Sequence, residues 1–166
     1  MILEARSAGC FSWTYVLKAN DRPIGKFEGQ WLSESVTIDL TERRHLEFRK
    51  ISWLGSQFQL VDLEDEGLLC ECDRAGLLTS AWDLNLSVGA GQLVKPGWFD
   101  TSYEFVQSNE TLARVDRLGW CERGFIVDGG DILTAEDLVM IGLVYHTIQN
   151  RQRRQHNNSG GAAAGS

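Results

Sequence analysis

The sequence predicts a mainly β protein in which a closed antiparallel barrel of about twelve strands surrounds a central hydrophobic C-terminal helix. Three observations lead to this fold class. Segments in which apolar and polar residues alternate recur at roughly ten-residue spacing as far as Val127, and turn-forming residues separate them. Only residues 134–149 have the pattern of a long helix. This helix is apolar at every position from Leu138 to Tyr145, which is typical of a helix buried on all sides.

Alternation identifies each strand, because successive side chains of a strand point to opposite faces of the sheet. In residues 34–41, for instance, Val36, Ile38 and Leu40 share one face. Residues 89–91 read Gly-Ala-Gly, which predicts a sharp bend or a bulge. The twelve predicted strands cover residues 2–7, 11–19, 24–28, 34–41, 45–53, 57–62, 68–72, 78–88, 92–95, 102–107, 111–116 and 123–127.

The predicted helix begins with clear start signals. Thr134 is a good N-cap residue, Asp137 completes a variant of the capping box, and Leu133 and Leu138 occupy the two hydrophobic-staple positions. A helix of about 15 residues is roughly 22 Å long, which is less than the roughly 30 Å hydrocarbon core of a bilayer. We therefore expect protein, and not lipid, to surround this helix.

A closed barrel explains how the strands and the helix form one object. Closure removes the exposed edges of the sheet, and the lumen of so large a barrel must then be filled. The apolar helix is about as long as such a barrel is tall, and Gly142 would allow one wall to approach it closely. We therefore expect the core of the helix to consist of Leu138, Met140, Ile141, Gly142, Leu143 and Tyr145.

The chain is long enough for one domain with a substantial core, since it has 166 residues. We assign residues 1–155 to the barrel, with its core helix at about 134–150. After Gln149 the sequence loses its apolar residues and ends in Gly, Ala and Ser. Residues 156–166 are therefore predicted to form a disordered tail.

The net charge and the cysteine content restrict the partners and the cellular compartment that the sequence predicts. The net charge of −7 argues against a broad nucleic-acid interface, which needs a basic surface. The four cysteines, Cys10, Cys70, Cys72 and Cys121, are interpreted as small buried residues in a reducing compartment, and no cofactor is expected. The N-terminus lacks the apolar core of a signal peptide. These features favour a cytoplasmic protein, which could be peripheral to a membrane.

Two stretches carry a resemblance to a known family. They are the hairpin KANDRPIGKF at residues 18–27 and the segment FIVDGGDILTAEDLVMIGLVYHTIQ at residues 125–149. Together with the strand pattern, they resemble the tubby C-terminal-like superfamily, which includes the tubby, LURP-one-related and phospholipid scramblase families. The resemblance implies a barrel around a central helix and, in different branches, phosphoinositide binding or other lipid-linked roles. It implies no settled enzymatic chemistry.

Few residues suggest a catalytic or metal-binding role. The sequence contains no phosphate-binding loop, dinucleotide fingerprint, nucleophile elbow or zinc-protease motif. Asp128 and Asp131 flank a Gly-Gly turn before the helix and could hold calcium, and the resemblance to scramblases points to an acidic segment in a similar place. Capping of the helix explains these acidic residues equally well. They are the two candidate metal ligands.

The basic residues form pairs that could bind a lipid headgroup. The resemblance to tubby proteins implies a Lys/Arg pocket on the barrel wall, although that motif does not match this sequence residue by residue. Solvated surface cations are the alternative interpretation. The candidate headgroup ligands are Arg43, Arg44, Arg49, Lys50, Arg151, Arg153 and Arg154.

Aromatic residues near the strand ends allow two interpretations. Trp31, Trp98, Phe99 and Trp120 could close the barrel ends or form an exposed recognition patch. Core packing is the prediction for most of them, because Trp is highly buried on average.

The function predicted from the sequence is a non-enzymatic binding or scaffold module, whose partner is an anionic membrane surface or another protein. The alternative is a small-molecule carrier with an open apolar barrel, which would need a cavity of several hundred cubic ångströms. An enzyme is the least favoured class, since no nucleophile and base stand in a recognisable arrangement. The oligomeric state does not follow from these residues.

Overall fold

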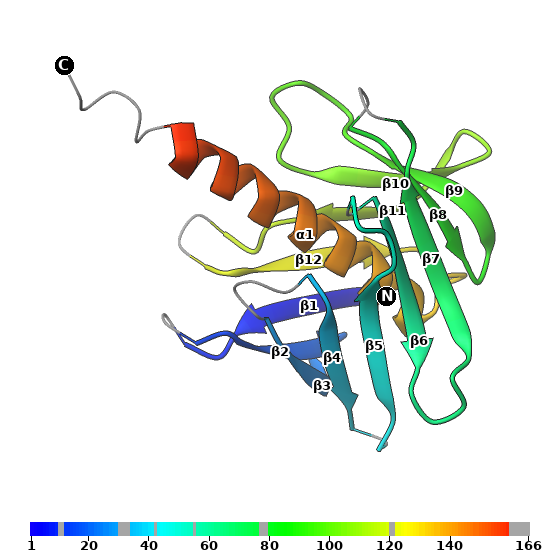
Figure 1. Ribbon diagram of the computed structural model, residues 1–166. Helices are drawn as coiled ribbons and strands as arrows, with labels where there is room; N and C mark the ends of the chain where they lie inside the picture. The colour runs from blue at the N-terminus through cyan, green and yellow to red at the C-terminus, as the bar shows by residue number, and fades with distance from the viewer. Residues whose placement is uncertain are drawn as a thin grey trace.

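The computed structural model describes residues 1–9, 12–29, 34–41, 43–54, 56–76, 80–119 and 122–159. Twelve antiparallel strands form a closed barrel, in which each strand pairs with its neighbours in sequence and β1 pairs with β12 (Figure 1). One helix, α1 (Ala135–Ser159), follows β12 and runs through the barrel. The fold class that the sequence predicts is confirmed.

Each predicted strand corresponds to one strand of the barrel. The match is close because the inward face of every strand contributes buried residues to the core, which is the condition under which alternation is informative. The strands are β1 (Ile2–Ser7), β2 (Thr14–Ala19), β3 (Arg22–Glu28), β4 (Val36–Leu40), β5 (His45–Lys50), β6 (Gln57–Asp62), β7 (Leu68–Arg74), β8 (Trp82–Leu86), β9 (Gly89–Val94), β10 (Tyr103–Gln107), β11 (Glu110–Asp116) and β12 (Gly124–Gly129).

Some strand boundaries differ from the prediction. β5 ends at Lys50, three residues before the predicted end, and β8 is shorter at both ends than residues 78–88. The bend was expected at residues 89–91, but the chain turns at residues 87–88 and residues 89–91 belong to β9. Gly91 serves close packing instead, since a Cβ atom there would lie 2.6 Å from the ring of Phe105.

The helix fills the barrel as predicted. Met140 and Ile141 have no exposed surface, and the other core residues of the helix are as deeply buried. Gly142 lies against the ring of Phe125, where an added Cβ atom would come within 2.0 Å of a ring carbon. The open lumen that a lipocalin-like carrier would need is therefore occupied by α1. The core helix residues that are at most 2% exposed are Leu138, Met140, Ile141, Leu143 and Tyr145.

The helix is longer than predicted. It continues to Ser159, whereas the sequence pattern predicted an end near residue 150. Residues 152–157 are exposed, so this extension lies beyond the apolar interior and its polar sequence carries no burial signal. Residues 156–159 of the predicted tail are helical, and residues 160–166 lie outside the described residues.

Strand direction divides the barrel into two ends. Because neighbouring strands are antiparallel, the connections from odd to even strands all lie at one end, and those from even to odd strands lie at the other. α1 begins after β12 at the second end and leaves through the first (Figure 1). We call these the helix-start end and the helix-exit end. Met1 lies at the helix-start end, where its ammonium group donates a hydrogen bond to the Gly129 carbonyl at 2.6 Å.

Candidate functional site

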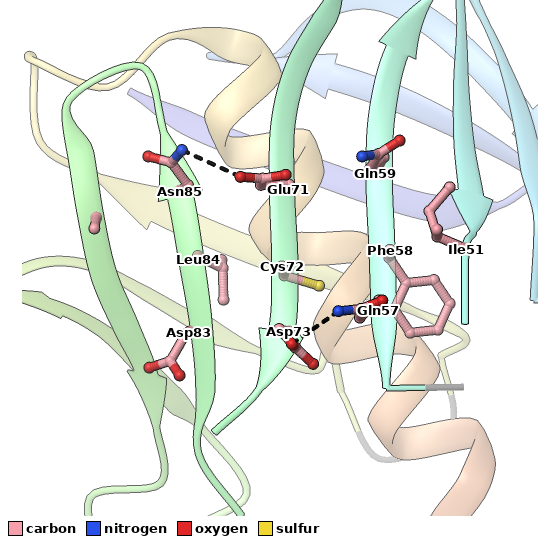
Figure 2. A pocket seen from close by; sticks show the side chains of 11 residues that line it. Ile51, Gln57, Phe58, Gln59, Glu71, Cys72, Asp73, Asp83, Leu84 and Asn85 are labelled. Carbon is pink, nitrogen blue, oxygen red and sulfur yellow. Dashed lines mark hydrogen bonds between the residues drawn. The ribbon is translucent and has the colours of Figure 1, made fainter. Parts of the chain in front are cut away.

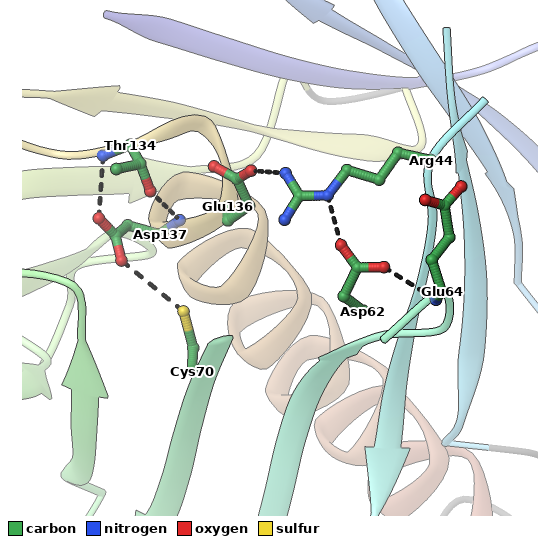
Figure 3. A network of polar contacts seen from close by, with 7 residues as sticks. All are labelled: Arg44, Asp62, Glu64, Cys70, Thr134, Glu136 and Asp137. Atoms are coloured by element: carbon green, nitrogen blue, oxygen red, sulfur yellow. Dashed lines mark hydrogen bonds and ion pairs between the residues drawn. The ribbon is translucent and has the colours of Figure 1, made fainter. Parts of the chain in front are cut away.

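A buried carboxylate anchors the first turn of α1 at the helix-start end (Figure 3). Asp137 is 0% exposed and accepts hydrogen bonds from the backbone N–H of Thr134 at 2.9 Å and from that of Ser87 at 2.8 Å. The Ser87 hydroxyl donates a further short bond. Burial raises the pKa of Asp137, but these bonds outweigh it and leave the pKa below its ordinary value. The predicted capping box is thus present, and Ser87 in the β8–β9 turn extends it.

Arg44 joins the β4–β5 turn to the helix at the same end (Figure 3). Its guanidinium pairs with Asp62 at 2.6 Å and makes a second ion pair with Glu136. The hydrogen bond to Asp62 is the main cause that raises the pKa of Arg44, and the same bond lowers the pKa of Asp62. Arg44 therefore has an intramolecular role, whereas its neighbour Arg43 is exposed and has a φ of 60°.

The two candidate metal ligands lie near this end of the barrel. Asp128 is exposed on the outer face of β12, and the Asp131 side chain is fully exposed, 3.9 Å from the N-terminal ammonium group. Among the residues that the structure describes, no three His, Cys, Asp or Glu side chains are grouped closely enough to hold a metal ion. The calcium site stays a prediction without a set of ligands around it.

The outer wall of the barrel has a groove of about 310 Å³ across β6, β7 and β8 (Figure 2). Amide side chains pair with carboxylates across it: Gln57 donates to Asp73 at 3.0 Å, and Asn85 donates to Glu71 at 3.5 Å. Asp83 adds a third carboxylate. The carboxylates would repel a phosphate group, so this groove is unlike the basic wall pocket that the resemblance to tubby proteins implies.

Three of the other candidate headgroup ligands gather near the helix-exit end around Glu34. Arg151 donates to this carboxylate at 2.6 Å and 2.8 Å, and Lys50 lies 3.2 Å from it. Burial raises the pKa of Glu34, but Arg151 and Lys50 together lower it below its ordinary value. Arg154 lines a small cavity with Glu34, and Arg49 donates to Gln59 at 3.3 Å on the adjacent wall.

Arg153 is exposed on the same protruding part of α1 as Arg151 and Arg154. The structure therefore divides the seven candidates between the two ends. Arg43 and Arg44 lie at the helix-start end, and the other five lie near the helix exit.

The two ends carry opposite charge. In the described residues of the strand connections and of the helix terminus, nine charged side chains lie at each end. At the helix-start end seven of the nine are acidic: Asp21, Glu64, Asp65, Glu66, Asp131, Glu136 and Asp137, against Arg43 and Arg44. At the helix-exit end six of the nine are basic: Lys95, Arg117, Arg123, Arg151, Arg153 and Arg154, against Glu34, Asp100 and Glu122.

The helix-exit end also exposes large apolar side chains. Trp53 and Leu54 are 94% and 81% exposed, and Trp98 and Phe99 are 95% and 102% exposed. Core packing, which the sequence predicted for most of the aromatic residues near the strand ends, does not hold for Trp98 and Phe99. The preceding Pro-Gly pair is a turn signal that could have indicated their exposure. Trp31 and Trp120 lie outside the described residues.

The thiols and the imidazole of the interior are buried or partly buried. Cys70 and Cys72 are buried as predicted, and burial is the first cause that raises the pKa of both thiols, that of Cys72 to about 12. His146 packs among the rings of Tyr15, Phe27 and Phe125, and burial lowers its pKa to about 4. At neutral pH these groups are a pair of thiols and a neutral imidazole. Cys10 and Cys121 lie outside the described residues.

Comparison with known proteins bears on the fold. No protein-family model matches the sequence, and no curated protein is significantly similar to it. The structure is similar to the X-ray structure of a protein from Arabidopsis thaliana, with a TM-score of 0.60. The two share 12% sequence identity over 89% of this chain and 91% of the other. At this identity the similarity concerns the fold alone.

Within the described residues, no helix combines the length and the apolar content needed to cross a bilayer.

Proposed function

We propose that this protein is a non-enzymatic binding module of the tubby-like type, related to the LURP-one-related and scramblase-like branches, which binds anionic membrane surfaces with its helix-exit end. The observation that carries the proposal is the opposite charge of the two ends. Although the whole chain has a net charge of −7, an anionic surface would attract one end and repel the other.

The filled barrel supports a binding role on the outer surface. Because α1 occupies the lumen, a partner must be met by the wall or by one of the ends. The wall groove presents the carboxylates Glu71, Asp73 and Asp83, which disfavour an anionic partner. The helix-exit end combines Lys95 with the cations of the protruding helix. A place on the cytoplasmic face of a membrane agrees with this proposal, since anionic lipids are concentrated there.

Sedimentation with vesicles of phosphatidylcholine and phosphatidylserine tests the proposal. We expect binding that weakens as salt concentration rises, because each basic residue near an anionic surface contributes on the order of 1 kcal/mol. Reversing two charges in Arg153→Glu/Arg154→Glu should weaken binding about tenfold or more. The matched control, Arg22→Glu/Arg43→Glu, makes the same change in net charge at the helix-start end and should bind like the wild type.

Two results would count against the proposal. The first is the absence of binding to anionic vesicles at low salt. The second is an equal loss of binding in both charge-reversal variants, which would show that only the total charge matters. Adding phosphoinositides to the vesicles tests whether a particular headgroup is preferred.

A further inference from the structure

Two hairpin tips at the helix-exit end present their apolar side chains in a similar way. In the β9–β10 connection, the Asp100 N–H donates to the Gly97 carbonyl at 3.3 Å, so Trp98 and Phe99 are the central residues of a turn. The Lys95 ammonium group donates to the Trp98 carbonyl at 3.1 Å and supports the turn from below. Both aromatic side chains point away from all packed elements, as their exposure shows.

The β5–β6 connection has the same plan. The Ile51 N–H donates to the Gln57 carbonyl at 3.0 Å and closes the base of the loop. Above it, the hydroxyl groups of Ser52 and Ser56 lie 3.2 Å apart. Trp53 and Leu54 lie beyond this pair, at the tip.

Chain reversal does not require apolar residues at these tips. The turns at the helix-start end are mostly polar, although Leu63 and Ile132 are exposed there. All six non-glycine residues with positive φ in the described part of the chain occur at this end: Asn20, Asp21, Arg43, Glu66, Ser108 and Asn109. Asn, Asp and Gly are the residues that such turns favour. Two pairs of nearly fully exposed apolar residues at one end therefore indicate a contact surface.

We infer that the Trp53–Leu54 and Trp98–Phe99 tips insert into the interfacial layer of the bilayer and orient the helix-exit end toward it. This inference rests on the proposed function. Trp suits the membrane interface because its ring is apolar and its N–H can still meet water. Lys50 and Lys95 lie at the bases of the two tips, where anionic headgroups would complement them. The two tips protrude as separate points, which suits a deformable lipid layer better than a shaped protein surface.

Variants of the tips test the inference. Trp53→Ser/Leu54→Ser and Trp98→Ser/Phe99→Ser should keep the wild-type melting temperature, because these side chains are 81–102% exposed. Each should weaken binding to phosphatidylcholine–phosphatidylserine vesicles about tenfold or more, since each loses two membrane-inserted side chains. The loss should persist at high salt, where the electrostatic attraction is screened. The control Leu63→Ser/Ile132→Ser removes exposed apolar residues at the helix-start end and should bind normally.

Quenching of tryptophan fluorescence by lipids with brominated acyl chains gives a second readout. The wild type should be quenched on binding, and the quenching should fall in the two tip variants but not in the control. If the wild type binds the vesicles and the tip variants bind equally well, the inference is overturned and the proposed function stands. If the tip variants instead convert a dimer of the wild type into a monomer with unchanged vesicle binding, the tips join two copies of the chain, which also overturns the inference. If the wild type does not bind the vesicles, both proposals fail.

Discussion

The two ends of the barrel use their surface residues differently. At the helix-start end, Asp137 and Arg44 are bound to neighbouring elements and most turn residues are polar. At the helix-exit end, Arg151 is paired with Glu34, and two hairpin tips carry apolar side chains that are 81–102% exposed. Both ends belong to one cooperative barrel around one helix. The difference teaches that a buried anchor for the helix and exposed apolar side chains can lie at separate ends of a protein whose interior is filled.

The separation follows from the course of α1. The helix must be anchored where it enters the barrel, because its first N–H groups lack partners within the helix. Asp137 and Thr134 provide these partners at the helix-start end. At the exit the helix continues into solvent as far as Ser159, so its last carbonyls face no such constraint. At this end Arg151 holds the helix to Glu34 through an ion pair, and residues 152–157 beyond it are exposed.

The largest expected loss of stability comes from a substitution in the core that both ends share. Gly142→Leu should unfold the domain, because even a Cβ atom would lie 2.0 Å from the ring of Phe125. Overpacking a core costs about 1–3 kcal/mol or more, and here the ring has no free side toward which to move. Circular dichroism during heating measures the loss. Gly119→Ala is the control, since nothing lies within 4 Å of a Cβ atom there. A Gly142→Leu variant that melted like the wild type would mean that α1 is not central.

A smaller loss of folding stability should follow from a substitution at the helix-start end alone. Asp137→Asn removes the charge from a buried carboxylate that accepts bonds from Thr134 and Ser87, and it should cost about 2–3 kcal/mol. Urea denaturation measures this change. Asp131→Asn, at an exposed position of the same end, should leave the denaturation midpoint unchanged. Vesicle binding by folded Asp137→Asn should match the wild type, and a loss of binding without unfolding would break the separation of the two ends.

The third effect concerns the dependence of folding stability on pH. His146 has a pKa of about 4 in the folded protein, below its ordinary value of 6.5, so folding favours the neutral imidazole. Its contribution to stability is fully present above pH 6.5 and is lost as pH falls toward 4, by at most about 1.4 kcal/mol per pH unit. The pKa of Asp137 is lowered from 3.8, so its contribution is lost only at lower pH. Folding free energies measured in urea between pH 7.5 and 4.5 should therefore report His146.

Replacement of the imidazole tests this assignment. His146→Phe keeps an aromatic ring beside Tyr15 and Phe27 but cannot titrate, so stability should depend less on pH between 6.5 and 4.5. His156→Gln, at an exposed position beyond the barrel, should keep the wild-type pH dependence. The assignment to His146 is wrong if the Phe variant has the same slope as the wild type.

Sequence patterns predicted the fold better than the site. Alternation located all twelve strands, because each strand has one face turned toward the core. The capping box at Thr134 and Asp137 was visible in the sequence because its two partners are three residues apart. The seven basic candidates are divided between opposite ends of the barrel, so they do not form one site, and their role as headgroup ligands stays a prediction. Sequence spacing cannot indicate that Arg44 is paired with Asp62 and Glu136, which come from distant segments.

The exposed aromatic tips show where side-chain type misleads. Trp98 and Phe99 are residue types that usually lie in a core. The turn closed by the hydrogen bond from Asp100 to Gly97 places them in solvent. Trp82 has the same character and is buried, because it lies on the inward face of β8. Burial of an apolar residue at a strand end is thus decided by whether the strand continues through it.

The amino-acid sequence by itself determined the number of strands, the apolar helix and its N-cap, because these depend on contacts between residues close in the chain or on the period of one element. Only the tertiary structure decided which loops share an end, since closure of the barrel brings together connections that are far apart in sequence. Closure therefore turned scattered charges and isolated aromatic residues into one acidic, anchored end and one basic end with exposed apolar tips.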